Sequence, residues 1–156
     1  IRGTPTVTQL LIMYFVVLKG VDGLIVGTVT FGLNSAAYVA EIIRAGILAV
    51  DHGQMGGGRS LGLSYGQTMK DIILPQAVKN ILPALGNEFI VLIKETARLG
   101  YVSIVDLTKV ADFVTSRTYE AFAPLIGTAI IYYLVVKVLT LVLGAVERRL
   151  RQSDKR

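Results

Sequence analysis

The sequence predicts an all-α membrane protein, a polytopic bundle of transmembrane helices. Three observations lead to this fold class. Hydrophobic residues make up 53% of the 156 residues and charged residues only 17%, whereas a soluble domain carries about 25% charged residues. The apolar residues gather in four long stretches. These stretches lack the polar face that a helix on the surface of a soluble protein shows every 3.6 residues, so a soluble helical core fits them poorly.

The four stretches predict spans of about 3–18, 23–46, 80–98 and 121–146. A spanning helix needs ~20 largely apolar residues, and the second and fourth stretches meet that length. The third is marginal because a glutamate interrupts it, and the first needs residues ahead of it. Since the chain starts without Met, directly before an apolar stretch, we expect a fragment that lacks its N-terminal part. A transmembrane domain over 1–150 and a basic tail at 147–156 complete the expected organisation.

Basic residues predict the orientation of the bundle. Five of the sixteen fall in the last nine positions, namely Arg148, Arg149, Arg151, Lys155 and Arg156. Lys and Arg are enriched on the cytoplasmic side of membrane proteins. The C-terminus is therefore expected in the cytoplasm, as is the loop between the second and third spans, whereas the turn at residues 19–22 is expected outside.

The cytoplasmic loop at residues 51–75 is too polar to span. Ser64 and Gln67 have the spacing of a capping box, which starts a helix. Tyr65, Met69, Ile72 and Ile73 then form an apolar stripe at helical spacing, and Pro75 is expected to end the helix. Such an amphipathic helix lies on the lipid surface, packs on its own bundle or docks into a partner's groove. Periodicity leaves these alternatives open.

Few residues suit catalysis or metal binding. The absence of cysteine excludes disulfides and thiolate metal sites. The one histidine, His52, is expected to be solvated rather than to bind a metal. The sequence also contains no phosphate-binding Gly-x-x-x-x-Gly-Lys-[Ser/Thr] motif. We therefore expect no catalytic residue and no metal site, and a membrane enzyme fits these residues poorly.

The 51–75 loop resembles the cytoplasmic coupling loop of type I ABC importer permeases. That family's pattern is Glu-Ala-Ala, three residues, Gly, nine residues, Ile, one residue and Leu-Pro. The matching positions here are held by Gly62, Ile72, Leu74 and Pro75. The Glu-Ala-Ala positions hold Gly56, Gly57 and Gly58 instead, so the carboxylate expected to tie the loop to an ATPase is absent. Because a helical Gly costs roughly 1 kcal/mol relative to Ala, we expect a loosened first coupling helix, with Asp51 or Gln54 as the nearest substitute for that carboxylate.

Further runs resemble the polar amino-acid branch of this family, the histidine, glutamine and arginine permeases. They are Arg2-Gly-Thr-Pro5, Leu33-Asn-Ser-Ala-Ala-Tyr38, Leu82-Pro-Ala-Leu-Gly-Asn87 and Lys94-Glu-Thr96. The resemblance covers nearly the whole chain. Family members carry a further helix and a half before the first of these runs, in agreement with the expected fragment.

The resemblance implies a permease subunit that moves polar amino acids across the bacterial cytoplasmic (inner) membrane by alternating access. Its implied partners are cytoplasmic ABC ATPase subunits, a second permease subunit, an extracytoplasmic amino-acid-binding protein and the lipid bilayer, with no nucleic acid. ATP and Mg would bind to the ATPase, and no cofactor to this chain. The residues expected to couple it to the ATPase are Gly56, Gly57, Gly58, Arg59, Gly62, Leu63, Ile72, Leu74 and Pro75. An ion-coupled secondary amino-acid transporter is the alternative function.

Polar and ionisable residues within spans mark candidate substrate pathways, because they are costly in lipid. The pathway candidates are Asn34, Glu88, Glu95, Thr96 and Arg98. Arg98 has the geometry to clamp a substrate carboxylate, while Glu95 takes the amino group; the alternative is that the two form an ion pair. Glu41 and Arg44, three residues apart, are expected to pair at the cytoplasmic end. A lysine, Lys137, also interrupts the last span.

Overall fold

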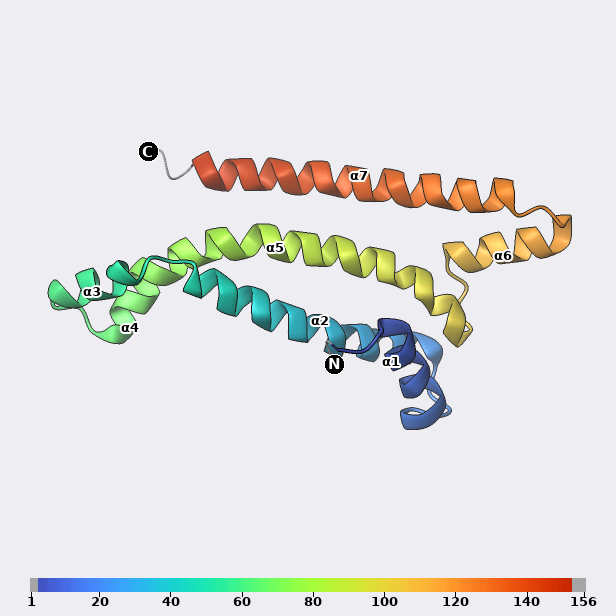
Figure 1. Ribbon diagram of the computed structural model, residues 1–156, viewed down its shortest axis with the longest axis horizontal. Helices are drawn as coiled ribbons and strands as arrows, with labels where there is room; N and C mark the ends of the chain where they lie inside the picture. Colours follow the sequence, from blue (N-terminus) through green and yellow to red (C-terminus); the bar gives the residue numbers. More distant parts are fainter. Residues whose placement is uncertain (1–2, 153–156) are drawn as a thin grey trace. The chain divides into compact units, whose positions relative to one another are not determined.

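The computed structural model describes residues 3–152, with side chains described for residues 3–148 (Figure 1). Within that part of the chain all regular structure is helical, which confirms the predicted all-α class. The expectations placed on Arg2 and on the side chains of Arg149, Arg151, Lys155 and Arg156 fall outside the described residues. The helical segments, with η for π- and 3-10 turns, are α1 Thr6–Ile12, η1 Met13–Val17, α2 Gly23–Leu48, α3 His52–Ser60, α4 Tyr65–Thr68, η2 Met69–Ile73, α5 Leu74–Glu95, η3 Thr96–Val102, α6 Leu107–Thr118 and α7 Phe122–Gln152.

The chain forms two compact units. The first comprises residues 1–37 and 89–141, and the second residues 38–88 and 142–156. Helices α2, α5 and α7 each run from one unit into the other. Each unit has its own hydrophobic core.

The core of the first unit joins the N-terminal helices to the segment around η3. Its buried residues are Leu10, Val26, Phe31 and Val102, against which Leu99 and other apolar side chains pack. Close approach depends on glycine, since a Cβ added to Gly23 would lie 2.5 Å from the carbonyl oxygen of Val102. Small residues that let helix backbones meet are typical of membrane bundles.

The core of the second unit joins the end of α2 to the start of α5. Val50, Ile73, Ala77 and Ile81 are buried there, and partly buried neighbours from α2, α3 and η2 pack against them. Gly46 of α2 lies directly on the side chain of Ile81 and has no room for a Cβ. This core places the segment between α2 and α5 against the helices that flank it.

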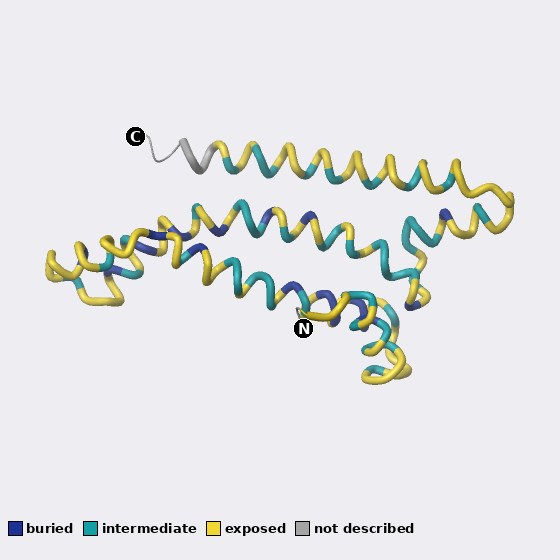
Figure 2. Tube along the Cα trace, in the orientation of Figure 1, coloured by how far each residue is buried: buried dark blue, intermediate teal, exposed yellow. Residues whose placement is uncertain are grey.

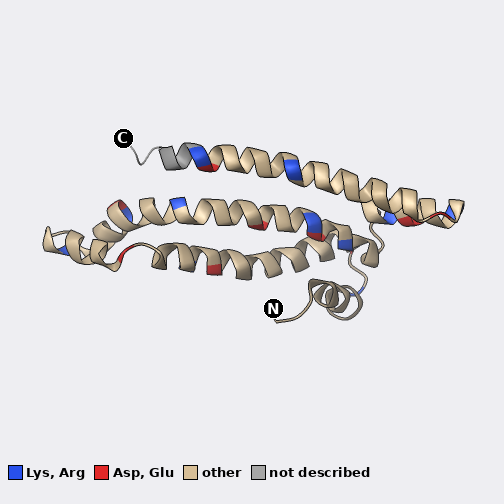
Figure 3. Cartoon of the chain, turned by 45° about the horizontal axis from the view of Figure 1, so that its top comes forward, with Lys and Arg blue, Asp and Glu red and all other residues tan. Residues whose placement is uncertain are grey.

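Apolar surface dominates the long helices. Helices α2 and α7 are long and apolar enough to cross a membrane, and neither the 18-residue window of α7 nor any residue of α7 with a described side chain is buried (Figure 2). Charged residues are sparse along the apolar stretches of α2 and α7 (Figure 3). Such continuous apolar surface would be unusual on a soluble monomer and is typical of helices that lie in lipid. Helices α2 and α7 start and end close to the predicted spans 23–46 and 121–146.

The prediction that Pro75 ends a short helix is wrong. Helical structure runs without interruption from α4 through η2 into α5, and Pro75 is the second residue of α5. The reason is the π turn η2, in which the N–H of Leu74 donates to the carbonyl of Met69, five residues back. A π turn widens the helix and so relieves the clash between a proline ring and the preceding turn, which normally breaks a helix.

Candidate functional site

Residues 51–75 fold into two antiparallel helical arms, which we call the 51–75 hairpin. Its first arm, α3, contains all three glycines of the Gly56–Gly58 run and still forms a helix. Asp51 caps this helix, because its Oδ1 accepts a hydrogen bond of 2.5 Å from the N–H of Gly53. An N-cap of this kind stabilises a helix by ~1 kcal/mol. The carboxylate proposed as a substitute for the family's glutamate is therefore already bonded to its own helix.

The turn between the arms depends on Gly62. Its φ is +84°, in the left-handed region that glycine enters without a steric penalty. The N–H of Gly62 donates to the carbonyl of Arg59 at 3.0 Å, and the N–H of Leu63 donates to the carbonyl of Gly58 at 3.2 Å. These two bonds make a Schellman motif, which ends a helix and satisfies its last carbonyls. The positive φ of this turn thus explains why the family pattern has glycine at the position of Gly62.

The second arm begins with the predicted capping box, which is confirmed. The N–H of Gln67 donates to Ser64 Oγ at 3.3 Å, and the N–H of Ser64 donates to Gln67 Oε1 at 2.9 Å. Of the predicted apolar stripe, Ile73 is buried and Met69 packs on the core of the second unit. Tyr65 does not join them and is 58% exposed. Most of the stripe therefore packs on its own bundle.

The two arms meet where Gly58 faces Thr68. Gly58 is buried, and a Cβ placed on it would lie 2.5 Å from Thr68 Cγ2 and 3.1 Å from Ile72 Cδ1. Thr68 is fully buried, and its hydroxyl donates to the carbonyl of Ser64 at 3.0 Å. Sequence reasoning named Gly58 as a weak helix former and as a candidate for ATPase coupling, and it did not identify Thr68 as its contact. A small residue at Gly58 is what allows the arms to touch.

The outer surface of the 51–75 hairpin carries the groups available to a partner. Leu61 at the tip is 82% exposed, and Arg59 beside it is also exposed. Gly56 and Gly57 have open space around their Cα atoms, with nothing within 4 Å of an added Cβ. Sequence reasoning did not select Leu61, although an isolated apolar residue in a polar turn was a usable signal. His52 is exposed at the first position of α3, as expected for a solvated side chain.

In the first unit, a chain of hydrogen bonds links α1 to α2. Asn34 Nδ2 donates to Gln9 Oε1 at 3.1 Å, and Gln9 Nε2 donates to Thr4 Oγ1 at 2.7 Å. Thr4, Gln9 and neighbouring apolar residues line a cavity of about 250 Å³. Asn34 was a pathway candidate, whereas its partner Gln9 was not recognised from the sequence. Polar side chains that bond between helices hold membrane bundles together.

The charged pathway candidates are largely paired. Arg98 donates to the carboxylate of Glu95, so the predicted alternative of an ion pair is what the structure contains. The hydroxyl of Thr96 donates to a backbone carbonyl one turn back, at 2.6 Å. Glu88 lies on α5 in the second unit and is partly buried. A pathway role for these residues remains a prediction.

The other predicted ion pair is confirmed. Arg44 donates to the carboxylate of Glu41 through both Nε and a terminal nitrogen, near the C-terminal end of α2. A two-pronged contact of this kind fixes the geometry of both side chains. The sequence spacing of three residues was sufficient to predict it.

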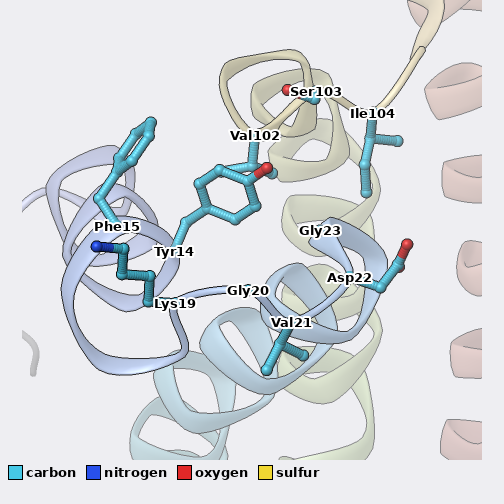
Figure 4. A pocket seen from close by; sticks show the side chains of 10 residues that line it. All are labelled: Tyr14, Phe15, Lys19, Gly20, Val21, Asp22, Gly23, Val102, Ser103 and Ile104. Atoms are coloured by element: carbon cyan, nitrogen blue, oxygen red, sulfur yellow. The ribbon is translucent and has the colours of Figure 1, made fainter.

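A second cavity of the first unit lies at the turn between η1 and α2 (Figure 4). It measures about 430 Å³, and Lys19 and Asp22 of the turn line it together with Ser103 and Ile104 from the other side. Asp22 also caps α2, since its Oδ1 accepts a 2.8 Å hydrogen bond from the N–H of Leu24. The lining thus combines charged and polar side chains with apolar ones such as Phe15 and Val102.

Two helices long and apolar enough to cross a membrane, with a capped helical hairpin after the first of them, fit an integral membrane protein. The chain belongs to the family described as binding-protein-dependent transport system inner membrane component, which residues 1–152 match. It is therefore the permease subunit of an ABC importer and an inner membrane component, as the sequence resemblance implied. The alternative of an ion-coupled secondary transporter finds no support in this family, and the expectation of a transport subunit rather than an enzyme agrees with it.

Similar proteins agree with this assignment. The arginine transport system permease protein ArtQ of Bacillus subtilis is 47% identical over 157 residues, covering 98% of this chain and 72% of its own length. The glutamine transport system permease protein GlnP of Escherichia coli is 33% identical, covering 97% of this chain and 71% of its own. A crystal structure of an amino acid ABC transporter with histidines is 46% identical with a TM-score of 0.89, over 95% of this chain and 71% of that one.

Proposed function

We propose that this permease imports polar amino acids, and that the 51–75 hairpin transmits the work of a cytoplasmic ABC ATPase to its spans. The substrate class is supported by the names of its relatives, which include arginine and glutamine transport permeases. The coupling role is supported by the contacts that hold the hairpin together. Asp51, Gly62 and the Ser64–Gln67 box fix the ends of its arms, and the Gly58–Thr68 contact locks the arms together.

To transmit motion from the ATPase to the spans, the 51–75 hairpin must move as a rigid body. The second arm continues through η2 into α5 without a break, so displacement of the tip is carried directly into a long helix. Met69 and Ile73 also anchor the arm to the core around Val50 and Ala77. Closure of the ATPase pair on ATP would thus tilt α5 and switch the bundle between inward-open and outward-open forms, which is alternating access by rigid-body motion.

The proposed coupling role implies the following partners. ATP and Mg are bound by the ATPase subunits in the cytoplasm, where the 51–75 hairpin and the C-terminus lie. An extracytoplasmic amino-acid-binding protein delivers substrate on the opposite side, near the turn of residues 19–22. A second permease subunit, identical or different, covers part of the apolar surface of the spans. The chain itself holds no cofactor.

The substrate path is expected to pass the polar residues of the spans. The candidates are Asn34, Glu88, Glu95, Thr96 and Arg98. Arg98 has an anion already, in Glu95, so it meets a substrate carboxylate only in a conformation in which that pair opens. An ion pair that exchanges partners with a zwitterion would link substrate arrival to the switch of conformation.

Reconstitution tests the proposal. The full-length permease is co-purified with candidate ATPase subunits, placed in liposomes with the binding protein, and assayed for ATP hydrolysis with L-arginine, L-glutamine or L-leucine. We expect stimulation by a polar amino acid but not by leucine, together with its uptake. Association without stimulation by any amino acid would overturn the substrate class. No association with an ATPase would overturn the coupling role.

A further inference from the structure

The hydrogen bonds that link α1 to α2 have a direction that the backbone determines. Gln9 Nε2 donates to the backbone carbonyl of Thr4 at 3.1 Å and to Thr4 Oγ1 at 2.7 Å. A carbonyl oxygen accepts hydrogen bonds and never donates them, so the nitrogen of the Gln9 amide must be the atom that faces Thr4. Gln9 Oε1 therefore faces α2, where it accepts from Asn34 Nδ2 at 3.1 Å.

The same bonds fix the orientation of the Asn34 amide. Because Gln9 presents an oxygen, Asn34 can bond to it only through its nitrogen. Asn34 Oδ1, on the other side of the amide carbon, is then directed away from Gln9. Asn34 is partly buried in α2, a helix that is long and apolar enough to cross a membrane. The contact with α1 thus makes Asn34 present an acceptor, rather than a donor, to a ligand.

An oriented acceptor within an apolar helix suits a ligand that carries N–H groups. Polar side chains in a span are costly and mark a pathway by default. The amino acids of the function proposed above share an α-ammonium, which donates hydrogen bonds and cannot accept them. From the sequence, Glu95 was expected to take that group, but its carboxylate accepts from Arg98 in the structure. Asn34 Oδ1 is therefore the better candidate for the acceptor of the α-ammonium.

We propose that Asn34 Oδ1 accepts a hydrogen bond from the α-ammonium of the transported amino acid, and that Gln9 and Thr4 are positioning residues that hold the Asn34 amide in this orientation. The site rests on the proposed function, from which its ligand is taken. A reversed Asn34 amide would turn its own N–H groups toward the ammonium. Two donors would then face each other, and the ligand would lose this hydrogen bond.

The test measures the Kd of radiolabelled L-arginine and L-glutamine for the full-length permease purified with its ATPase, without the binding protein. Asn34→Leu removes the acceptor and should raise the Kd by roughly 10- to 100-fold, the factor expected from losing a hydrogen bond to a charged group. Asn34→Asp keeps an oxygen toward the ammonium in either orientation and should bind nearly as the wild type does. For 5-guanidinopentanoic acid, which is arginine without its ammonium, the wild type and Asn34→Leu should have the same Kd.

Gln9→Lys tests the positioning role. A lysine donates and cannot accept, so the Asn34 amide should turn its oxygen toward it, and the Kd should rise about as much as for Asn34→Leu. Adding Asn34→Asp supplies a second oxygen and should restore binding, a rescue that a purely structural role of Gln9 does not predict. The control is Thr8→Lys, which adds the same charge at the neighbouring exposed position of α1 and should leave the Kd unchanged.

A wild-type Kd for Asn34→Leu would overturn the site. Equal loss of binding by Asn34→Asp and Asn34→Leu would make Asn34 a donor and overturn the proposed orientation. If either single variant lowers the thermal midpoint, the comparison of Gln9→Lys with its combination with Asn34→Asp decides, because the combination restores a bond between the helices. A wild-type complex that neither binds nor imports L-arginine or L-glutamine would instead defeat the proposed substrate class, so the two failures are distinguishable.

Discussion

Gly58 of α3 lies in direct contact with Thr68 of α4, so that a Cβ on Gly58 would come within 2.8 Å of Thr68 Oγ1 and 2.5 Å of Thr68 Cγ2. Thr68 is fully buried and cannot swing into solvent to make room. The glycine run that makes α3 a weak helix by intrinsic propensity therefore includes one position at which glycine is required. The neighbouring Gly57 has open space around it, so the three glycines are not equivalent.

Replacing Gly58 by Ala should destabilise the 51–75 hairpin. An extra methyl group in a close-packed contact costs typically 1–3 kcal/mol, and we expect a lower thermal midpoint of the detergent-purified permease and weaker co-purification of the ATPase. The matched control is Gly57→Ala, which should be neutral or stabilising because Ala is the better helix former by roughly 1 kcal/mol. Adding Thr68→Ala to Gly58→Ala removes both clashing atoms and should restore much of the loss. Equal midpoints for Gly58→Ala and Gly57→Ala would contradict the contact.

Local chemistry explains which features the sequence predicts correctly. The Ser64–Gln67 capping box and the Glu41–Arg44 pair depend on residues three apart on one helix, and both were predicted. The continuation of helical structure through Pro75 was missed, because it depends on the hydrogen-bond register of η2. Sequence periodicity does not distinguish a π turn from an α turn of this length.

Contacts between distant residues were also missed. Gln9 and Asn34 are 25 residues apart, and nothing in either local sequence indicates the other. Thr68 reaches Gly58 only because the Schellman turn at Gly62 reverses the chain at the right point. Helix α5, Leu74–Glu95, begins six residues before the predicted span of residues 80–98, because helical structure continues into it from the second arm.

Replacing Gly62 by Ala should disrupt the turn through the backbone alone. A left-handed conformation costs a residue with a Cβ roughly 1–2 kcal/mol, and no atom lies within 4 Å of an added Cβ at Gly62. We expect a lower thermal midpoint, measured as above. Gly66→Ala is the control, because Gly66 has equally open space but lies within α4 without a positive φ. If both variants melt at the same temperature, the backbone conformation of Gly62 does not limit stability.

Restoring the family's acidic residue should strengthen the ATPase contact. Glu at Gly56 together with Ala at Gly57 fills open space on the exposed side of α3 and adds helix propensity and a carboxylate. We expect more ATPase to co-purify with this variant than with the wild type. A control variant with Gln at Gly56 and the same Ala at Gly57 adds helix propensity without the negative charge. It should show only part of the increase in ATPase co-purification. Unchanged or weaker ATPase binding by the Glu variant would show that this permease couples without a carboxylate there.

The exposed tip of the 51–75 hairpin should bind the ATPase through Leu61. An apolar side chain that is 82% exposed buries little surface within this chain, so its burial in a partner's groove would favour binding. Leu61→Asp should reduce ATPase co-purification and stimulated hydrolysis several-fold, while the thermal midpoint of the isolated permease stays at the wild-type value. Ser60→Ala, next to it and also exposed, serves as the control and should bind normally. Wild-type ATPase binding by Leu61→Asp would move the contact elsewhere on the hairpin, toward Arg59 and the open face of α3.

The bond between Gln9 and Asn34 should be measurable as a coupling energy. Interhelical hydrogen bonds in membrane bundles contribute about 0.6 kcal/mol on average, so Gln9→Ala and Asn34→Ala should each destabilise the bundle modestly. The double variant should lose less than the sum of the two, in unfolding titrations of the purified permease. A transport assay of Asn34→Ala then separates a structural role of Asn34 from a role in the substrate path. If the role is purely structural, the variant is less stable but its KM for the transported amino acid is unchanged. A raised KM at unchanged stability would instead place Asn34 in the substrate path, with Gln9 holding its amide in position.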